Sequence, residues 1–142
     1  MLTHYLDQAI GDLHELIALT DLDIEDVKAA RHDAMFGRIE TKERYLAAFE
    51  RHKASIDKAI GELVAQNPGS EMEELLDGDV RQKLDTLRNK LEELQERNRR
   101  FARFVITVGE FYNALYEEIL PIEKDGYTGK NAKLAALLEV RA

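Results

Sequence analysis

The chain has 142 residues, of which 34% are charged and 44% hydrophobic, so it can form one folded domain and is too hydrophobic for a disordered chain. Its net charge of −8 argues against general nucleic-acid binding, and the absence of cysteine excludes disulfides and thiol chemistry. The sequence has no apolar run of membrane-spanning length and no basic segment followed by an apolar one at its start. We therefore expect a cytoplasmic protein without a signal peptide or membrane insertion.

The first predicted element is a short amphipathic helix, because apolar residues recur at helical spacing from Leu2 to Ile17. Cap-type residues follow at Thr20–Asp23. These residues are compatible either with a break in the helix or with polar positions on a continuous helix. The sequence leaves both alternatives open.

A second, longer helix is predicted from near Ile24 to Ala65 or Gln66, because apolar residues step by four and three from Met35 to Leu63. Asn67–Ser70 should end it, since Pro68 disfavours helix in the residue before it. Within the connector 67–79, Ser70 with Glu73 predicts a capping box for a short helix, and Asp79 with Gln82 predicts the cap of the next helix.

The strongest pattern lies in the third predicted helix, residues 80–120. Apolar residues repeat about every 3.5 positions from Val80 to Ile119, and Asn98 alone interrupts the seam. Such a seam must be covered by the rest of the chain or by a partner. After it come Pro121, a turn-rich segment and a short apolar stretch at 134–140.

These patterns predict an all-α fold, an elongated antiparallel helical hairpin or bundle of three to four helices with coiled-coil-like packing. One helical domain would span 1–142, with N-terminal helices in 1–66, the connector 67–79, the long helix 80–120 and the tail 121–142. Because helices rise equally per residue, 24–63 would pair with 80–119, with position 24 beside position 119. Lys42 would then lie near Asn98, and we expect the two to form a polar layer that fixes the register.

The apolar face of the long helix widens after Asn98, where the residues flanking the seam become Ala102, Phe104, Gly109, Phe111 and Tyr116. So wide a face needs a second covering element. The first helix would lie over it if the chain turned back at 20–23. The tail 134–140 or the amphipathic helix of a partner could also cover it, and these alternatives are not exclusive.

The sequence shows no catalytic, cofactor or metal motif, so we do not expect an enzyme. The four histidines, His4, His14, His32 and His52, stand outside zinc-protease and di-iron patterns, and His52 as a phosphoacceptor is a distant alternative. The basic cluster Arg97–Phe104 is compatible with a nucleic-acid patch, but helical spacing favours cations bordering an apolar seam.

Residues Arg38–Phe49 resemble the x-K-x-x-L-L-x-x-L segment of the FlgN family of flagellar export chaperones. Leu91–Asn98 resembles that family's later segment, in which Asn closes a run of leucine-spaced polar residues. The turn Asp125–Gly129 and the short tail after it are also similar. The resemblance covers most of the chain as a pattern of loose motifs.

The resemblance implies a small cytoplasmic chaperone that binds the C-terminal amphipathic segments of the hook–filament junction proteins FlgK and FlgL before export through the flagellar type III apparatus. It also implies contact with components of the export gate or its ATPase. The client would be held by the C-terminal part of the chain. The expected partner-binding residues are Phe101, Phe104, Val105, Val108, Phe111, Tyr112, Leu115, Tyr116, Ile119, Leu134, Leu137 and Leu138. The alternative is a structural coiled-coil homodimer, or an adaptor without a secreted client.

Overall fold

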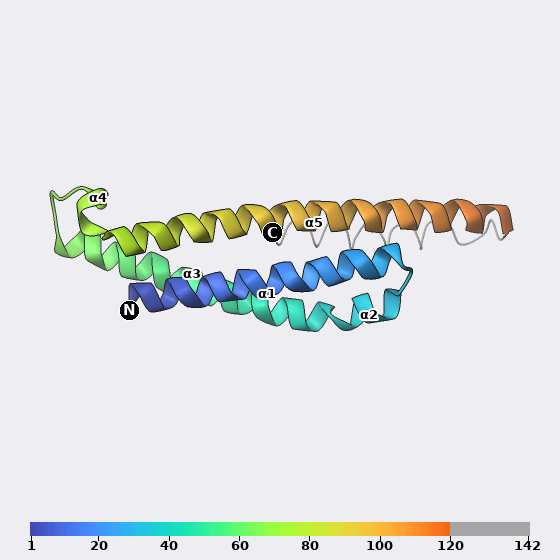
Figure 1. Cartoon of the computed structure of the whole chain (residues 1–142), viewed down its shortest axis with the longest axis horizontal. Helices are drawn as coiled ribbons and strands as arrows, with labels where there is room; N and C mark the ends of the chain where they lie inside the picture. The colour runs from blue at the N-terminus through green and yellow to red at the C-terminus, as the bar shows by residue number, and fades with distance from the viewer. Residues whose placement is uncertain (120–142) are drawn as a thin grey trace. The chain divides into compact units, whose positions relative to one another are not determined.

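The computed structural model describes residues 1–119, apart from the side chains of Tyr112 and residues 116–119, and all regular structure in that part of the chain is helical (Figure 1). The helices are α1 (Leu2–Lys28), α2 (His32–Gly37), α3 (Ile39–Gln66), α4 (Met72–Leu75) and α5 (Gly78–Ile119). The expected all-α helical bundle is confirmed. The predicted end of the second helix at Ala65 or Gln66 is also confirmed, and α5 covers the predicted long helix from Val80 to Ile119, the last described residue.

The chain divides into two compact units. Unit 1 comprises Met1–Ile17 and Glu40–Glu93, and unit 2 comprises Ala18–Ile39 and the residues from Leu94 onward. The first half of α1 and the first part of α5 therefore belong to unit 1. Their remaining turns belong to unit 2, together with α2.

In unit 1, α1 packs with α3 and the start of α5. Its buried hydrophobic residues are Leu6, Ala9, Leu13, Leu16, Ile17, Phe49, Ile56, Leu76 and Val80. Two polar contacts join the helices at the edge of this core: Lys83 Nζ lies 2.5 Å from Asp7 Oδ1, and His52 Nδ1 lies 2.6 Å from Asp12 Oδ2. Both carboxylates lie on α1, so α1 meets a basic side chain from each of its two neighbours.

α1 continues through Thr20–Asp23, so the alternative of a break there is wrong. Both residues lie inside unit 2, with exposed fractions of 0% for Thr20 and 2% for Asp23. The helix ends only after Lys28, where Ala30 adopts a φ of 59° and the Arg31 amide donates to the carbonyl of Asp26 at 2.7 Å. This six-to-one bond around a left-handed residue is a Schellman-type helix stop.

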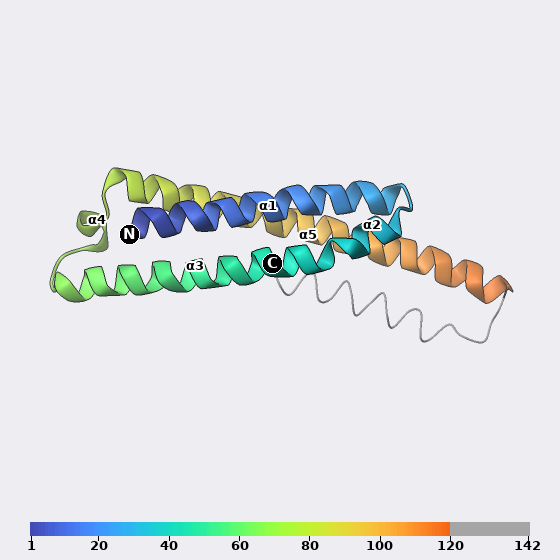
Figure 2. The same cartoon turned by 90° about the horizontal axis from the view of Figure 1, so that it is seen from below.

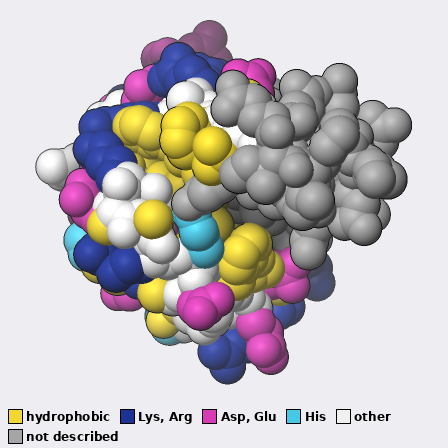
Figure 3. Space-filling view, turned by 90° about the vertical axis from the view of Figure 1, so that its right-hand side faces the viewer, with side chains coloured by type: hydrophobic (Ala, Val, Ile, Leu, Met, Phe, Trp, Pro, Cys, Tyr) yellow, Lys and Arg dark blue, Asp and Glu magenta, His cyan; other side chains and the backbone are white. Residues whose placement is uncertain are grey.

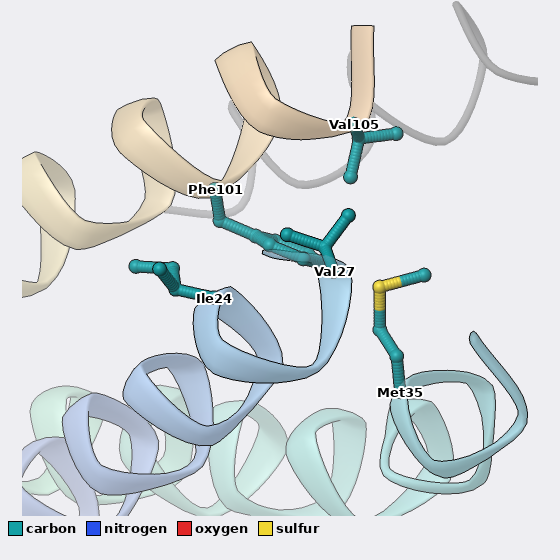
Figure 4. Close-up of a cluster of buried hydrophobic side chains, with 5 residues drawn as sticks. All are labelled: Ile24, Val27, Met35, Phe101 and Val105. Atoms are coloured by element: carbon teal, nitrogen blue, oxygen red, sulfur yellow. The ribbon is translucent and has the colours of Figure 1, made fainter. Parts of the chain in front are cut away.

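Because the turn falls at 29–31, the predicted start of the second helix near Ile24 is wrong: Ile24 lies on α1, and α3 begins at Ile39. The placement of position 24 beside position 119 is also wrong. Ile24 and Val27 of α1 form a buried cluster with Phe101 and Val105 of α5 and Met35 of α2 (Figure 4).

Within unit 2, α1 and α5 run parallel. Arg97 Nε donates to Asp21 Oδ1 at 2.8 Å, Thr20 Oγ1 donates to Asn98 Oδ1 at 3.5 Å, and the Ile24–Phe101 cluster follows one turn later on both helices. Asn98 is 8% exposed, so the seam does carry a buried polar position as expected. Within unit 2, Asn98 accepts a hydrogen bond from Thr20 of α1. Lys42 belongs to unit 1, and the Lys42–Asn98 polar layer stays a prediction.

Two predicted helix caps differ from those in the structure. α4 is preceded by Glu71, which makes no side-chain cap, so the Ser70–Glu73 capping box is wrong. At α5 the cap is Asp77, whose Oδ1 accepts from the Val80 amide at 2.8 Å, in place of Asp79. Asp77 satisfies one of the amides that a helix start leaves without an intrahelical partner.

Replacing a buried and an exposed phenylalanine of α5 should have different effects on stability. Phe101 is 2% exposed and Phe111 is 63% exposed. We expect Phe101→Ala to lower the free energy of unfolding by about 3–5 kcal/mol, because it removes a large buried side chain and leaves a cavity. Phe111→Ala, the matched control, should change it by less than about 1 kcal/mol in urea unfolding followed by circular dichroism. Equal losses would contradict this packing.

Candidate docking surface on α5

In unit 2, α5 extends well past the end of α1. The Thr20–Asn98 and Asp21–Arg97 contacts are offset by 78 and 76 positions, which places Lys28, the last residue of α1, level with about Phe104–Ile106. α5 continues to Ile119, which adds roughly 20 Å of helix at 1.5 Å per residue. Figures 1 and 2 both show α5 running past the turn between α1 and α2.

Four apolar residues form a strip along this part of α5: Phe104, Val108, Phe111 and Leu115. Their spacing of four, three and four positions places them on one face, as along a coiled-coil seam. Phe104 and Val108 are partly buried against the Ile24–Phe101 cluster. Farther along, Phe111 is 63% exposed and Leu115 is 42% exposed. The strip therefore continues the core of unit 2 onto the surface.

Cations stand at the buried end of the strip. Lys28 Nζ lies 5.4 Å from the centre of the Phe104 ring, and Arg100 Cζ lies 5.9 Å from the same ring. Both distances fall in the range of cation–π contacts. Figure 3 shows hydrophobic side chains gathered beside Lys and Arg side chains on this end of the molecule. The surface thus combines an apolar strip with positive charge.

The structure places the described members of the expected partner-binding set in two environments, the core of unit 2 and the strip. Phe101 and Val105 are buried in the core of unit 2, with exposed fractions of 2% and 5%, so they support the strip from beneath. Phe104, Val108, Phe111 and Leu115 form the strip itself. Tyr112, Tyr116 and Ile119 lie in α5 but their side chains are not described, and Leu134, Leu137 and Leu138 lie outside the described residues.

A buried charged network beneath the α1–α2 turn was not predicted from the sequence. Arg38 Nη1 donates to Asp23 Oδ1 at 2.9 Å, and its Nη2 lies 2.5 Å from Asp26 Oδ2. Arg31 Nε donates to the other oxygen of Asp26 at 2.8 Å. The carboxylates are 2% and 5% exposed as residues, so the network ties the last turns of α1 to the start of α3 from within.

The network also shifts the pKa values of Asp26 and Arg38. Hydrogen bonds from Arg31 and then Arg38 hold the pKa of Asp26 below its ordinary value of 3.8. Burial alone would lower the pKa of Arg38, but its contacts with Asp23 and Asp26 outweigh burial and raise it. Asp26 and Arg38 are therefore held in their charged forms at neutral pH.

Other kinds of site are not seen within residues 1–119. No three His, Asp or Glu side chains in that range gather as they would around a metal ion. Among the same residues, no helix has the length and apolar character needed to span a membrane. The chain matches no protein-family model, and no curated protein or solved structure is significantly similar to it.

Replacing the central cation should show how far the turn depends on this network. We expect Arg38→Met to lower the free energy of unfolding by about 3 kcal/mol at pH 7, because the buried Asp23 carboxylate loses its guanidinium partner. Arg51→Met, which removes an exposed arginine from α3, should stay within about 0.5 kcal/mol. A loss no larger than that of Arg51→Met would contradict a stabilising role.

The stability of Arg38→Met should depend on pH differently from that of the wild type. Since the folded pKa of Asp26 lies below 3.8, its contribution to stability is present above pH 3.8 and is lost as pH falls through the folded pKa. Without Arg38 the depression of the Asp26 pKa weakens, and burial of Asp26 favours its protonated form. The stability difference between wild type and Arg38→Met should therefore narrow below about pH 4 in urea titrations.

Proposed function

We propose that this protein is a cytoplasmic export chaperone that holds the C-terminal amphipathic segments of the flagellar hook-associated proteins FlgK and FlgL before type III secretion. The identity of the clients comes from the resemblance of three sequence stretches to the FlgN family. The proposal further includes contact with export-gate or ATPase components, through which the loaded chaperone would deliver its client.

The observation that carries the proposal is the strip Phe104–Val108–Phe111–Leu115. It lies on α5 where α1 has ended, and it presents two large apolar side chains at 63% and 42% exposure. Extended apolar surfaces are uncommon on monomers and frequently mark interaction sites. The strip spans about 17 Å along the helix, which suits an amphipathic helix of roughly three turns laid along it.

The energetics of such docking suit a client that must be released. A segment that is disordered when free orders only on binding, and this ordering subtracts from the gross interaction energy. Covering its apolar face would prevent premature assembly, while the reduced net affinity would permit transfer to the export machinery. The rest of the chaperone need not rearrange, because Phe101 and Val105 already support the strip from beneath.

The alternative is a structural homodimer that pairs the same strip with its counterpart in a second copy. The heptad-like spacing of the four strip residues favours this alternative as well, because such seams also join identical helices. The two functions differ in what occupies the strip, so sedimentation of the protein alone and with client peptide separates them.

Removing strip side chains should abolish client binding without unfolding the protein. We expect Phe104→Ala and Phe111→Ala each to weaken binding of the FlgK C-terminal peptide by at least about tenfold, because aromatic anchors dominate helix-in-groove interfaces. Isothermal titration would give the affinity and circular dichroism the helicity. Leu115→Ala should weaken binding less strongly, in proportion to its smaller side chain.

Leu22→Ala is the matched control, since it removes a leucine of similar exposure, 51%, from α1. It should leave the affinity unchanged. Full binding by Phe111→Ala would exclude the strip as the client site. A protein that self-associates without binding the peptide, and loses self-association in Phe111→Ala, would support the homodimer.

A further inference from the structure

We infer that the helix docking on the strip is acidic beside Phe104, where its carboxylates would meet a positive rim formed by Lys28, Arg100 and Arg103. This inference deepens the proposed function and rests on it, since it concerns the chemistry of the partner at the same surface. It specifies a class of segment, an amphipathic helix flanked by Asp or Glu, without depending on which protein carries it.

Charge is distributed unevenly in this chain. The whole sequence carries a net charge of −8, yet residues 97–104 contain four arginines and no acidic residue. The rim is therefore a local positive site on a protein that otherwise repels anions. An acidic helix is attracted electrostatically to this end of the strip and is repelled by most other surfaces of the protein.

The rim cations differ from Arg31, Arg38 and Arg97 of unit 2 in their ion pairs. Arg97 donates to Asp21, and Arg31 and Arg38 bind Asp26 and Asp23 inside the unit. Within residues 1–119, no carboxylate lies at ion-pair distance from Arg100 or Arg103, and Lys28 has only Glu25 at 3.8 Å on the same exposed helix face. These charges remain available to a partner.

The rim adjoins the strip. Arg100 precedes Phe104 by one helical turn, Arg103 neighbours it in sequence, and Lys28 reaches the same ring from α1. A docked helix whose apolar residues cover Phe104 would bring its flanking side chains over these cations. Rim charges of this kind act mainly on partner choice, association rate and salt dependence.

The test uses two synthetic peptides of about three heptads with leucine at positions a and d, one flanked by glutamate and the other by lysine at e and g. The global charge of −8 predicts tighter binding of the lysine peptide. The local rim predicts the opposite. We expect the glutamate peptide to bind the full-length protein at least about fivefold more tightly than the lysine peptide at low salt. This preference should shrink as salt is raised toward roughly 0.5 M, because that ionic strength screens charges on the surface.

Reversing the rim should reverse the preference. In Arg100→Glu/Arg103→Glu the lysine peptide should become the tighter ligand, and Arg103→Glu alone should reduce the preference if the double variant is poorly folded. Arg81→Glu/Arg88→Glu is the matched control, because it makes the same change in net charge at two exposed positions of α5 in unit 1. It should leave the glutamate peptide preferred.

The outcomes separate this inference from the proposed function. Equal affinities, or preference for the lysine peptide, would overturn the acidic partner while leaving the docking surface intact. Binding of neither peptide would overturn the docking surface and the inference together. If a single-stranded oligonucleotide bound in an Arg100- and Arg103-dependent manner and the glutamate peptide did not, the rim would belong to nucleic acid and the inference would be wrong.

Discussion

The residue at which α1 ends determines which turns of α5 are covered and which are exposed. Ala30 takes a left-handed conformation, the Arg31 amide closes the helix on Asp26, and α1 stops after Lys28. α5 runs parallel to it within unit 2 and continues to Ile119. Before that level, Arg97, Asn98 and Phe101 of α5 contact polar and apolar residues of α1. The turns after it carry Phe111 and Leu115 to the surface.

Charged contacts lie at this stop in addition to the apolar cluster of Ile24 and Val27. Asp23, Asp26 and Arg38 are drawn into the interior of unit 2, where bringing ions out of water is costly unless they are paired. A hydrophobic cluster in their place could be equally stable. The network has a property that such a cluster lacks, since the guanidinium contacts both carboxylates at fixed geometry. We interpret this ion-pair network as the contact that fixes the position of the turn between α1 and α2.

Sequence periodicity predicted the elements that are long and regular. The seam from Val80 to Ile119 and the stop after Gln66 followed from spacing and from Pro68, and both agree with the structure. The α1–α2 turn was missed because Ala30 occupies the left-handed position where glycine is the usual signal. Thr20 and Asp23 looked like surface or cap residues because their partners, Asn98 and Arg38, are 78 and 15 positions away.

The candidate surface was located by sequence only in outline. The widening of the apolar face after Asn98 predicted apolar residues beyond the reach of one neighbouring helix, and Phe111 and Leu115 in this part of α5 are exposed. The division of this apolar face into a buried part and an exposed part could not be predicted from the spacing. Which of Phe101, Phe104 and Phe111 is covered depends on where α1 ends, and that depends on contacts between residues distant in sequence.

The continuity between core and strip bears on how a partner would bind. Phe104 and Val108 contact the cluster that Ile24 and Val27 form with Phe101. In the proposed complex, a docked helix would therefore extend the interior of unit 2, packing along α5 as α1 does in the turns before it. Such a site is largely formed in advance, which limits the ordering cost to the incoming segment. The short length of the strip would limit the affinity, and a limited affinity suits the proposed chaperone, which would have to release its client for export.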